Sequence, residues 1–347
     1  MAIMTVNGKI DRKTLGVSLA HEHLLIDLRG LVDRPDPKEN PKFYEPLRMD
    51  NRRYIWSDPY AMLDNALIGD EKTAVSEAKI AKEDGVDTIV DVTLSDIARD
   101  PLALRRISKE SGVNVVMGCG HYIDGSLGEK VRSMTETQLT DEILNDLKKG
   151  AEGTDICAGV IGEIGTSAEV TADEWKNVRA AGFAAVETGA GVHIHTALWE
   201  RNGIAVAKTL IGLGVRPSKI CINHIDVDIR EDYLSELVDL GVIVEYDNFG
   251  KEFYIPKRER GLLLGRFAYD LERCRSIAGF VKRGYKKQIF VCNDICLKNM
   301  LCAYGGNGYA HITKNIVPML ADVGLSESEI DCILRENPAD FLDREDL

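Results

Sequence analysis

Two histidines separated by one residue, His21 and His23, close a short apolar segment near the start of the chain. If this segment is a strand, residues two apart point to the same face, so both imidazoles lie together while Glu22 points away. Two imidazoles on one face can bind a metal ion, although an isolated His-x-His pair is a weak indication of such a site. His193 and His195 repeat the spacing later in the chain. The chemistry that these residues suggest is metal-assisted.

Further side chains that commonly bind metals fall at or near the ends of other apolar segments: Glu163, His195, His224 and Asp294. The carboxyl ends of parallel strands meet at one face of a (β/α)8 barrel, and barrel enzymes build their active sites there. We therefore predict a single site formed by His21, His23, Glu163, His195, His224 and Asp294. The remaining histidines, His121, His193 and His311, are expected to have structural roles.

The strands that must position these residues are visible as short apolar segments at regular intervals. They span residues 16–23, 86–93, 113–120, 158–165, 192–196, 219–224, 242–249 and 288–294. The segments are continuously apolar, which is typical of parallel strands covered on both faces. Helical periodicity lies between them, at residues 71–85, 101–112, 172–189 and 201–214. Gly85, Gly112 and Gly214 end three of these segments, where a helix favours a residue that tolerates positive φ.

Strands that alternate with helices fit either a closed barrel or an open, doubly wound sheet. An open nucleotide-binding sheet would carry a glycine-rich phosphate loop after its first strand, but the first strand here ends in His-Glu-His. Because polar residues recur at several strand ends, the sequence predicts an α/β fold, a (β/α)8 TIM barrel with parallel strands. No internal repeat or linker is visible, so residues 1–347 are expected to form a single domain, with residues 1–15 as an N-terminal extension.

The connection after the first strand is unusually long. Residues 29–70 are rich in Pro, Tyr and Trp, and connections of this length are usually active-site covers or disordered segments. The aromatic content favours an ordered cover over the mouth of the barrel.

Composition limits the classes of partner. The net charge of −13 and the pI near 5.1 would repel phosphate backbones and anionic lipids, so neither a nucleic-acid nor a membrane partner is expected. No stretch approaches the roughly 18 apolar residues that span a bilayer. The eight cysteines are scattered without CxxC pairs, which indicates reduced thiols and a cytoplasmic location. The expected partner is a small-molecule substrate, and a homo-oligomer remains open.

Several motifs, read in order, resemble those of one known family: HEHLL, GVIGEIGTS, HIHT, INHID, EYDNFGKEF, VCNDI, YGGNGYAHI and RENPADFL. Together they are similar to the phosphotriesterase-related branch of the amidohydrolase superfamily, over essentially the whole chain. The resemblance implies a two-metal hydrolase. In this family the pair His21 and His23 would hold the more buried ion with Asp294, and His195 and His224 would hold the more exposed one. Glu163 would bridge both, where organophosphate-degrading members use a carboxylated lysine.

The implied cofactors are two divalent metal ions. Imidazole and carboxylate ligands suit zinc, manganese, cobalt or iron, and zinc is the default expectation. Two ions roughly 3.5 to 4 Å apart can share a bridging hydroxide and polarise the substrate oxygen. Asp294 is then the expected catalytic residue, which takes the proton of that hydroxide and passes it to the leaving group.

The loops must select the substrate. Lys251 and Tyr254, with Arg258 nearby, follow the seventh strand and could bind an anionic group, while Tyr122 follows the third strand and could bind a polar one. We expect cleavage of a carboxylic ester, a lactone such as a sugar-phosphate lactone, or an amide that bears an anionic group. The alternatives are phosphotriesterase activity, a metal-dependent binding protein without turnover, and an open-sheet enzyme with an organic cofactor.

Overall fold

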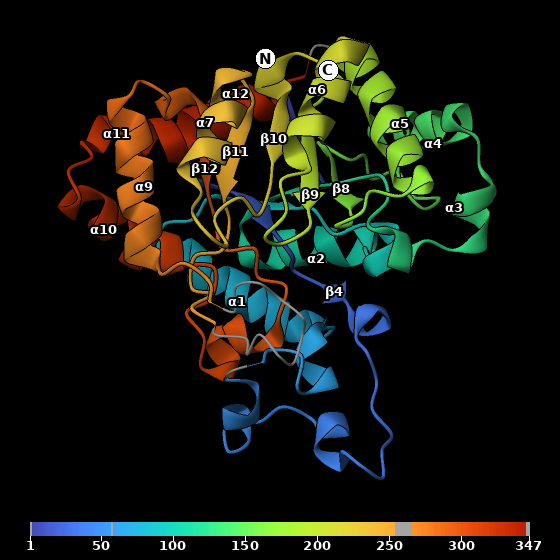
Figure 1. Ribbon diagram of the computed structural model, residues 1–347, viewed down its shortest axis with the longest axis vertical. Coiled ribbons are helices and arrows are strands. Elements are labelled where there is room, and N and C mark those ends of the chain that lie inside the picture. The colour runs from blue at the N-terminus through green and yellow to red at the C-terminus, as the bar shows by residue number, and fades with distance from the viewer. Residues whose placement is uncertain (1, 57, 254–265, 345–347) are drawn as a thin grey trace.

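The computed structural model describes residues 2–56, 58–253 and 266–344 (Figure 1). Its strands are β1 (Ala2–Thr5), β2 (Gly8–Asp11), β3 (Ser18–Glu22), β4 (Ile26–Asp27), β5 (Leu67–Ile68), β6 (Thr88–Asp91), β7 (Asn114–Met117), β8 (Ile161–Thr166), β9 (Val192–Thr196), β10 (Ile220–Ile222), β11 (Ile243–Tyr246) and β12 (Ile289–Val291). Its α-helices are α1 (Glu71–Glu83), α2 (Pro101–Ser111), α3 (Glu129–Ser133), α4 (Glu136–Lys148), α5 (Ala172–Thr188), α6 (Gly203–Leu213), α7 (Glu231–Asp239), α9 (Asp270–Lys282), α10 (Val317–Asp322), α11 (Glu327–Asp331) and α12 (Asn337–Leu342).

The central strands form a closed, parallel barrel. β3, β6 and β7 pair in that order, and β8 through β12 pair in the order of the chain. Two backbone contacts join these sheets: the Gly162 amide donates to the Cys119 carbonyl at 2.7 Å, and the Asp294 amide donates to the His21 carbonyl at 3.3 Å. The predicted TIM barrel is therefore confirmed, and each of its predicted strand segments overlaps one of these strands.

Helices surround the barrel on the outside (Figure 1). The segments predicted to be helical contain α1, α2, α5 and α6. Gly112 and Gly214 cap α2 and α6 with φ of 77° and 102°, as expected for glycine at a helix end. Among the described residues, no helix is both long and apolar enough to cross a bilayer.

The long connection after β3 projects from the end of the barrel toward which the strand arrows point, below the barrel in Figure 1. Its two ends are joined because β4 pairs with β5 in antiparallel fashion. Between them, short 3₁₀ helices surround a small apolar cluster of Leu47, Ile55 and Met62. An ion pair of 2.6 Å between Lys298 and Asp64 ties this segment to the loop after β12.

A glycine allows β7 and β8 to approach at the seam of the barrel. A Cβ atom on Gly118 would overlap the backbone oxygen of Gly162 and lie 3.1 Å from the Cα atom of Val92. Because backbone cannot move aside as a flexible side chain can, we expect Gly118→Ala to lower the free energy of unfolding by at least about 1–3 kcal/mol. Urea denaturation measures this change.

The matched control is Gly279→Ala, because a Cβ on this glycine of α9 meets no neighbouring atom within 4 Å. Alanine favours a helix more than glycine does, so the control is expected to gain up to about 1 kcal/mol. Equal stability of the two variants would contradict the close approach at Gly118.

Candidate active site

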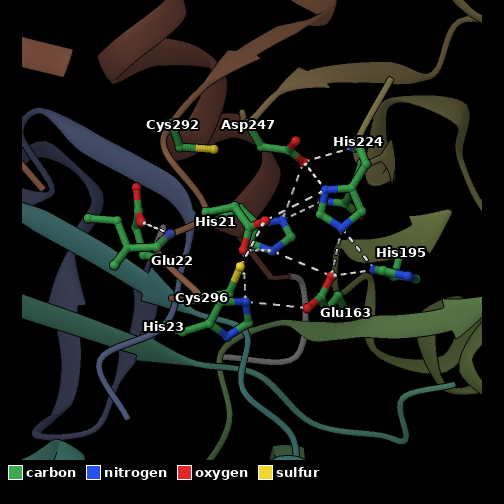
Figure 2. A network of polar contacts seen from close by, with 12 residues as sticks. His21, Glu22, His23, Glu163, His195, His224, Asp247, Cys292 and Cys296 are labelled. Carbon is green, nitrogen blue, oxygen red and sulfur yellow. Dashed lines mark hydrogen bonds and ion pairs between the residues drawn. The ribbon is translucent and has the colours of Figure 1, made fainter. Parts of the chain in front are cut away.

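The six predicted residues converge at the carboxyl ends of the barrel strands. Figure 2 shows His21, His23, Glu163, His195 and His224 of this cluster. They come from five strands or the loops that follow directly: His21 and His23 from β3, Glu163 from β8, His195 from β9, His224 after β10 and Asp294 after β12. The Glu22 side chain points away from the cluster, as expected, and instead accepts the Ile295 amide at 2.9 Å, which joins β3 to the loop after β12.

Glu163 lies between the imidazoles. Its Oε1 is 3.4 Å from His23 Nε2, and its Oε2 is 3.4 Å from His21 Nε2, His195 Nδ1 and His224 Nε2. Burial raises the pKa of Glu163, but contacts with His21 and His195 outweigh it and hold the pKa well below its ordinary value. The two oxygens of an ionised carboxylate thus face different sets of imidazoles, which is the arrangement that a bridging ligand requires.

Asp294 completes the side of the cluster formed by the first histidine pair. Its Oδ1 lies 3.1 Å from His23 Nε2 and 3.6 Å from His21 Nε2, while its Oδ2 forms an ion pair with Lys251. Burial raises the pKa of Asp294, but the Lys251 ammonium and the contact with His23 more than offset this and keep it low. Asp294 is therefore ionised, with one oxygen toward the histidines and the other toward a cation.

The backbone at two of these positions is unusual. His224 and Asp294 have φ of 59° and 46°, in the left-handed region that non-glycine residues rarely adopt. Such a conformation costs about 1–3 kcal/mol and is concentrated at functional sites. The strain at both positions is consistent with side chains that are placed for function.

The cluster fits a pair of cations. His21 Nε2, Glu163 Oε2 and Asp294 Oδ1 are buried and have no hydrogen-bond partner among the described residues, a costly condition that a bound cation would relieve. Burial lowers the pKa of His23, but Asp294 and Glu163 raise it to about 9, so the carboxylates attract positive charge. Several groups of side chains hold their ligand atoms within 4.8 Å of one another, and Glu163 belongs to two of them, one with His21 and His23 and one with His195 and His224.

A second layer of polar residues orients the imidazoles. Glu245, fully buried on β11, lies with its Oε2 3.1 Å from His21 Nδ1 and 3.3 Å from His193 Nδ1, and it accepts a hydrogen bond from Asn223. With the Nδ1 proton of His21 donated to Glu245, the Nε2 lone pair would face Glu163 and the cluster. Thr93 Oγ1 lies 2.9 Å from His23 Nδ1, and an Asp247 carboxylate oxygen lies 3.1 Å from His224 Nδ1.

Sequence reasoning did not find this layer. The signal was present, because Glu245 is an acidic residue within the apolar segment 242–249. The histidines assigned structural roles have polar partners: His193 contacts Glu245, His121 contacts Glu142 at 3.3 Å, and His311 contacts Asp270 at 2.8 Å.

Replacing Glu245 with glutamine should weaken metal binding. The variant keeps the shape of the side chain, but its neutral amide orients His21 less strongly, and outer partners of metal ligands typically contribute about 10- to 100-fold in affinity. Competition with a chromogenic chelator measures the change. Glu327→Gln, an exposed glutamate at the start of α11, is the control, and equal affinities in the two variants would contradict the orienting role.

Two of the residues predicted to bind substrate, Tyr122 and Lys251, lie beside the cluster. Tyr122 is buried, with its hydroxyl 3.1 Å from His195 Nδ1. Lys251 is only 4% exposed and contacts Asp294, so it is not a solvated surface group. Tyr254 and Arg258 lie outside the described residues. Tyr122 and Lys251 line a cavity of about 110 Å³, here called the reaction cavity, together with Glu163, His195 and Asp294.

Known proteins resemble this chain in sequence and in fold. Residues 1–342 match the sequence profile of the Phosphotriesterase family. The chain belongs to the phosphotriesterase family. Relatives named N-acetyltaurine hydrolase include one from Danio rerio, 35% identical over 342 residues that cover 98% of this chain and 97% of the relative. One from Homo sapiens is 33% identical over 342 residues, with the same coverage of 98% and 97%.

Two solved structures share the fold. A resiniferatoxin-binding protein from Rhodobacter sphaeroides aligns with a TM-score of 0.93 and 34% identity over 99% of this chain and 95% of that chain. The phosphotriesterase homology protein from Escherichia coli, solved with phosphate in its active site, aligns with a TM-score of 0.78 and 26% identity over 96% and 100%. The predicted family and the predicted hydrolase class are both confirmed.

Proposed function

We propose that this phosphotriesterase-family protein is a two-metal hydrolase that cleaves the amide bond of a small N-acyl compound bearing an anionic group. The observation that carries the proposal is the position of Glu163, which has its two oxygens directed at different histidines, beside an ionised Asp294 that pairs with Lys251. The names of the curated relatives support an amide among the bonds expected from the sequence.

Different residues of the cluster would bind the two metal ions. His21, His23 and Asp294 would hold one divalent ion, His195 and His224 the other, and Glu163 would contact both. When bound, the pair of ions would polarise the scissile carbonyl and make water a stronger nucleophile at neutral pH. Zinc is our first choice, because these ligand types suit it.

Asp294 can transfer the proton of the attacking water to the leaving group. As an ionised carboxylate in the reaction cavity, it can accept a proton from the attacking water and deliver it to the nitrogen of the departing amine. Without that transfer the amine would leave as an unstable anion. Tyr122, whose hydroxyl is 3.1 Å from His195 Nδ1, can donate a hydrogen bond to the carbonyl oxygen as it gains negative charge.

Lys251 supports an anionic substrate. Lys251 lines the reaction cavity. Burial lowers the pKa of its ammonium, but the neighbouring Asp294 carboxylate raises the pKa by more, so the ammonium stays charged. An ammonium has three donors, and the ion pair with Asp294 leaves donors for a sulfonate or carboxylate. We also propose that residues 29–70 cover the mouth, since Pro59 and Tyr60 from this segment line the reaction cavity.

A substrate screen tests the proposal. Metal-loaded protein would be assayed against N-acetyltaurine, N-acetyl amino acids, lactones, sugar-phosphate lactones and paraoxon, with a chelator control for each active compound. We expect the highest kcat/KM on an anionic N-acyl compound, and loss of activity with the chelator. A preference for a lactone or for paraoxon would replace the amide by that substrate class, and binding without any turnover would favour a non-catalytic binding protein.

We further propose a cytoplasmic location. All eight cysteines are free, which suits a reducing compartment. Fractionation of the cells that produce the protein tests this, and recovery in a secreted fraction would contradict it.

A further inference from the structure

A second cavity lies beside the reaction cavity. It has a volume of about 350 Å³, against about 110 Å³ for the reaction cavity. Cavities that enclose drug-sized ligands usually have roughly 300–1,000 Å³, so the second cavity can hold a substantial organic group and the reaction cavity cannot. The apolar side chains of its lining include Ile55, Trp56, Phe249, Ile295 and Met300.

One wall separates the two cavities. In the loop after β11, Asn248 and Lys251 line the reaction cavity, whereas Phe249 and Glu252 line the second one. The loop after β12 is divided in a similar way, with Asp294 and Cys296 on the reaction side and Asn293 and Ile295 on the other. The same two loops thus supply residues to the lining of both cavities.

Phe253 is the one residue, among those the structure describes, that lines both cavities. Its carbonyl accepts the Phe267 amide at 3.0 Å, and the two rings meet edge to face with centroids 5.6 Å apart. Phe267 lines the reaction cavity only. The Phe253 ring therefore lies at the boundary, held by a contact on the reaction side.

We infer that the second cavity receives the acyl chain of N-acyl substrates longer than acetyl, and that Phe253 determines how readily the chain enters. The inference rests on the proposed amide hydrolysis. The apolar side chains of the lining offer contacts to an acyl chain, whereas an anion would meet the carboxylates of Glu252 and Asp270 as well as the guanidinium of Arg52. The anionic end has a partner in Lys251, on the reaction side of the wall.

The catalytic test compares N-acetyltaurine with N-octanoyltaurine. Phe253→Ala should raise the ratio of kcat/KM for octanoyl over acetyl by at least about 10-fold, a typical effect of altered apolar pocket contacts. Leu28→Ala, the matched control, shortens a side chain that lines the reaction cavity but not the second one, and it should not raise the ratio. Adding Asn307→Trp, which fills the second cavity from an exposed position, should reverse the gain of Phe253→Ala.

A binding test is independent of turnover. Trp56 lines the second cavity and is 73% exposed, so octanoate bound to the metal-loaded protein should shift its fluorescence, whereas acetate should not. Trp56→Phe should remove the signal, which separates it from the signals of Trp175 and Trp199.

The two proposals fail in different ways. If octanoate shifts Trp56 fluorescence but no N-acyltaurine is hydrolysed, the second cavity still binds an acyl chain and the proposed function is wrong. If N-acetyltaurine is hydrolysed but Phe253→Ala leaves the substrate ratio unchanged, Phe253 does not control chain length. An absent fluorescence response to octanoate would remove the second cavity as an acyl site.

Discussion

Asp294→Asn should lower kcat by about 10²- to 10⁴-fold, the usual contribution of a general acid–base group. The asparagine keeps the shape of the side chain and one oxygen for His21 and His23 to face, so the fold and much of the bound metal should persist. What it loses is the basic carboxylate oxygen that takes the proton from water and returns it to the amine. Steady-state kinetics on the best substrate of the screen, with metal content determined on the same sample, measures the effect.

Asp322→Asn is the control for that variant, because this carboxylate is exposed at the end of α10, away from the cluster. It should retain the kinetics of the unchanged protein. Turnover of Asp294→Asn close to that of the control would exclude Asp294 as the proton-transfer group, whatever the metal content.

Glu163→Gln should remove activity and metal binding together. The carboxylate has an oxygen 3.4 Å from each of four imidazole nitrogens, and a neutral amide cannot supply the anion that both ions would share. We expect a loss in metal affinity of more than about 100-fold, since even outer partners of metal ligands contribute about 10- to 100-fold. Elemental analysis after dialysis measures the metal that remains.

The corresponding control is Glu327→Gln, an exposed glutamate at the start of α11. Circular dichroism should show that both variants are folded. If Glu163→Gln retains as much metal as the control, Glu163 is not a shared ligand, and the site must be assigned around His21, His224 and Asp294 instead, a group whose ligand atoms also lie close together.

The sequence was sufficient to predict the barrel and the members of the cluster. Continuous apolar segments and helical periodicity are local properties, and the carboxyl ends of parallel strands converge whatever the residues between them. The closeness of His21 to Asp294, which are far apart in the chain, follows from closure of the barrel and needs no knowledge of loop structure. The same rule placed Glu163 and His224 in the cluster.

The second layer and the cavities could not be predicted, because they depend on contacts between loops and on side-chain directions. Glu245 of β11 contacts His21 of β3 and His193 of β9, two strands that do not pair with β11, so these contacts depend on which side chains meet inside the closed barrel. Lys251 was expected to meet a substrate anion, but it also pairs with Asp294. The pairing of Lys251 with Asp294 depends on the path of the loop after β11, and the hydrophobic periodicity of the sequence does not predict that path.

Anomalous diffraction from crystals of the zinc-reconstituted protein tests the central claim most directly. Two peaks are expected at the zinc absorption edge, one beside His21, His23 and Asp294 and one beside His195 and His224, with Glu163 in contact with both. A map without anomalous density among these side chains, from crystals that contain zinc, would contradict the two-metal site.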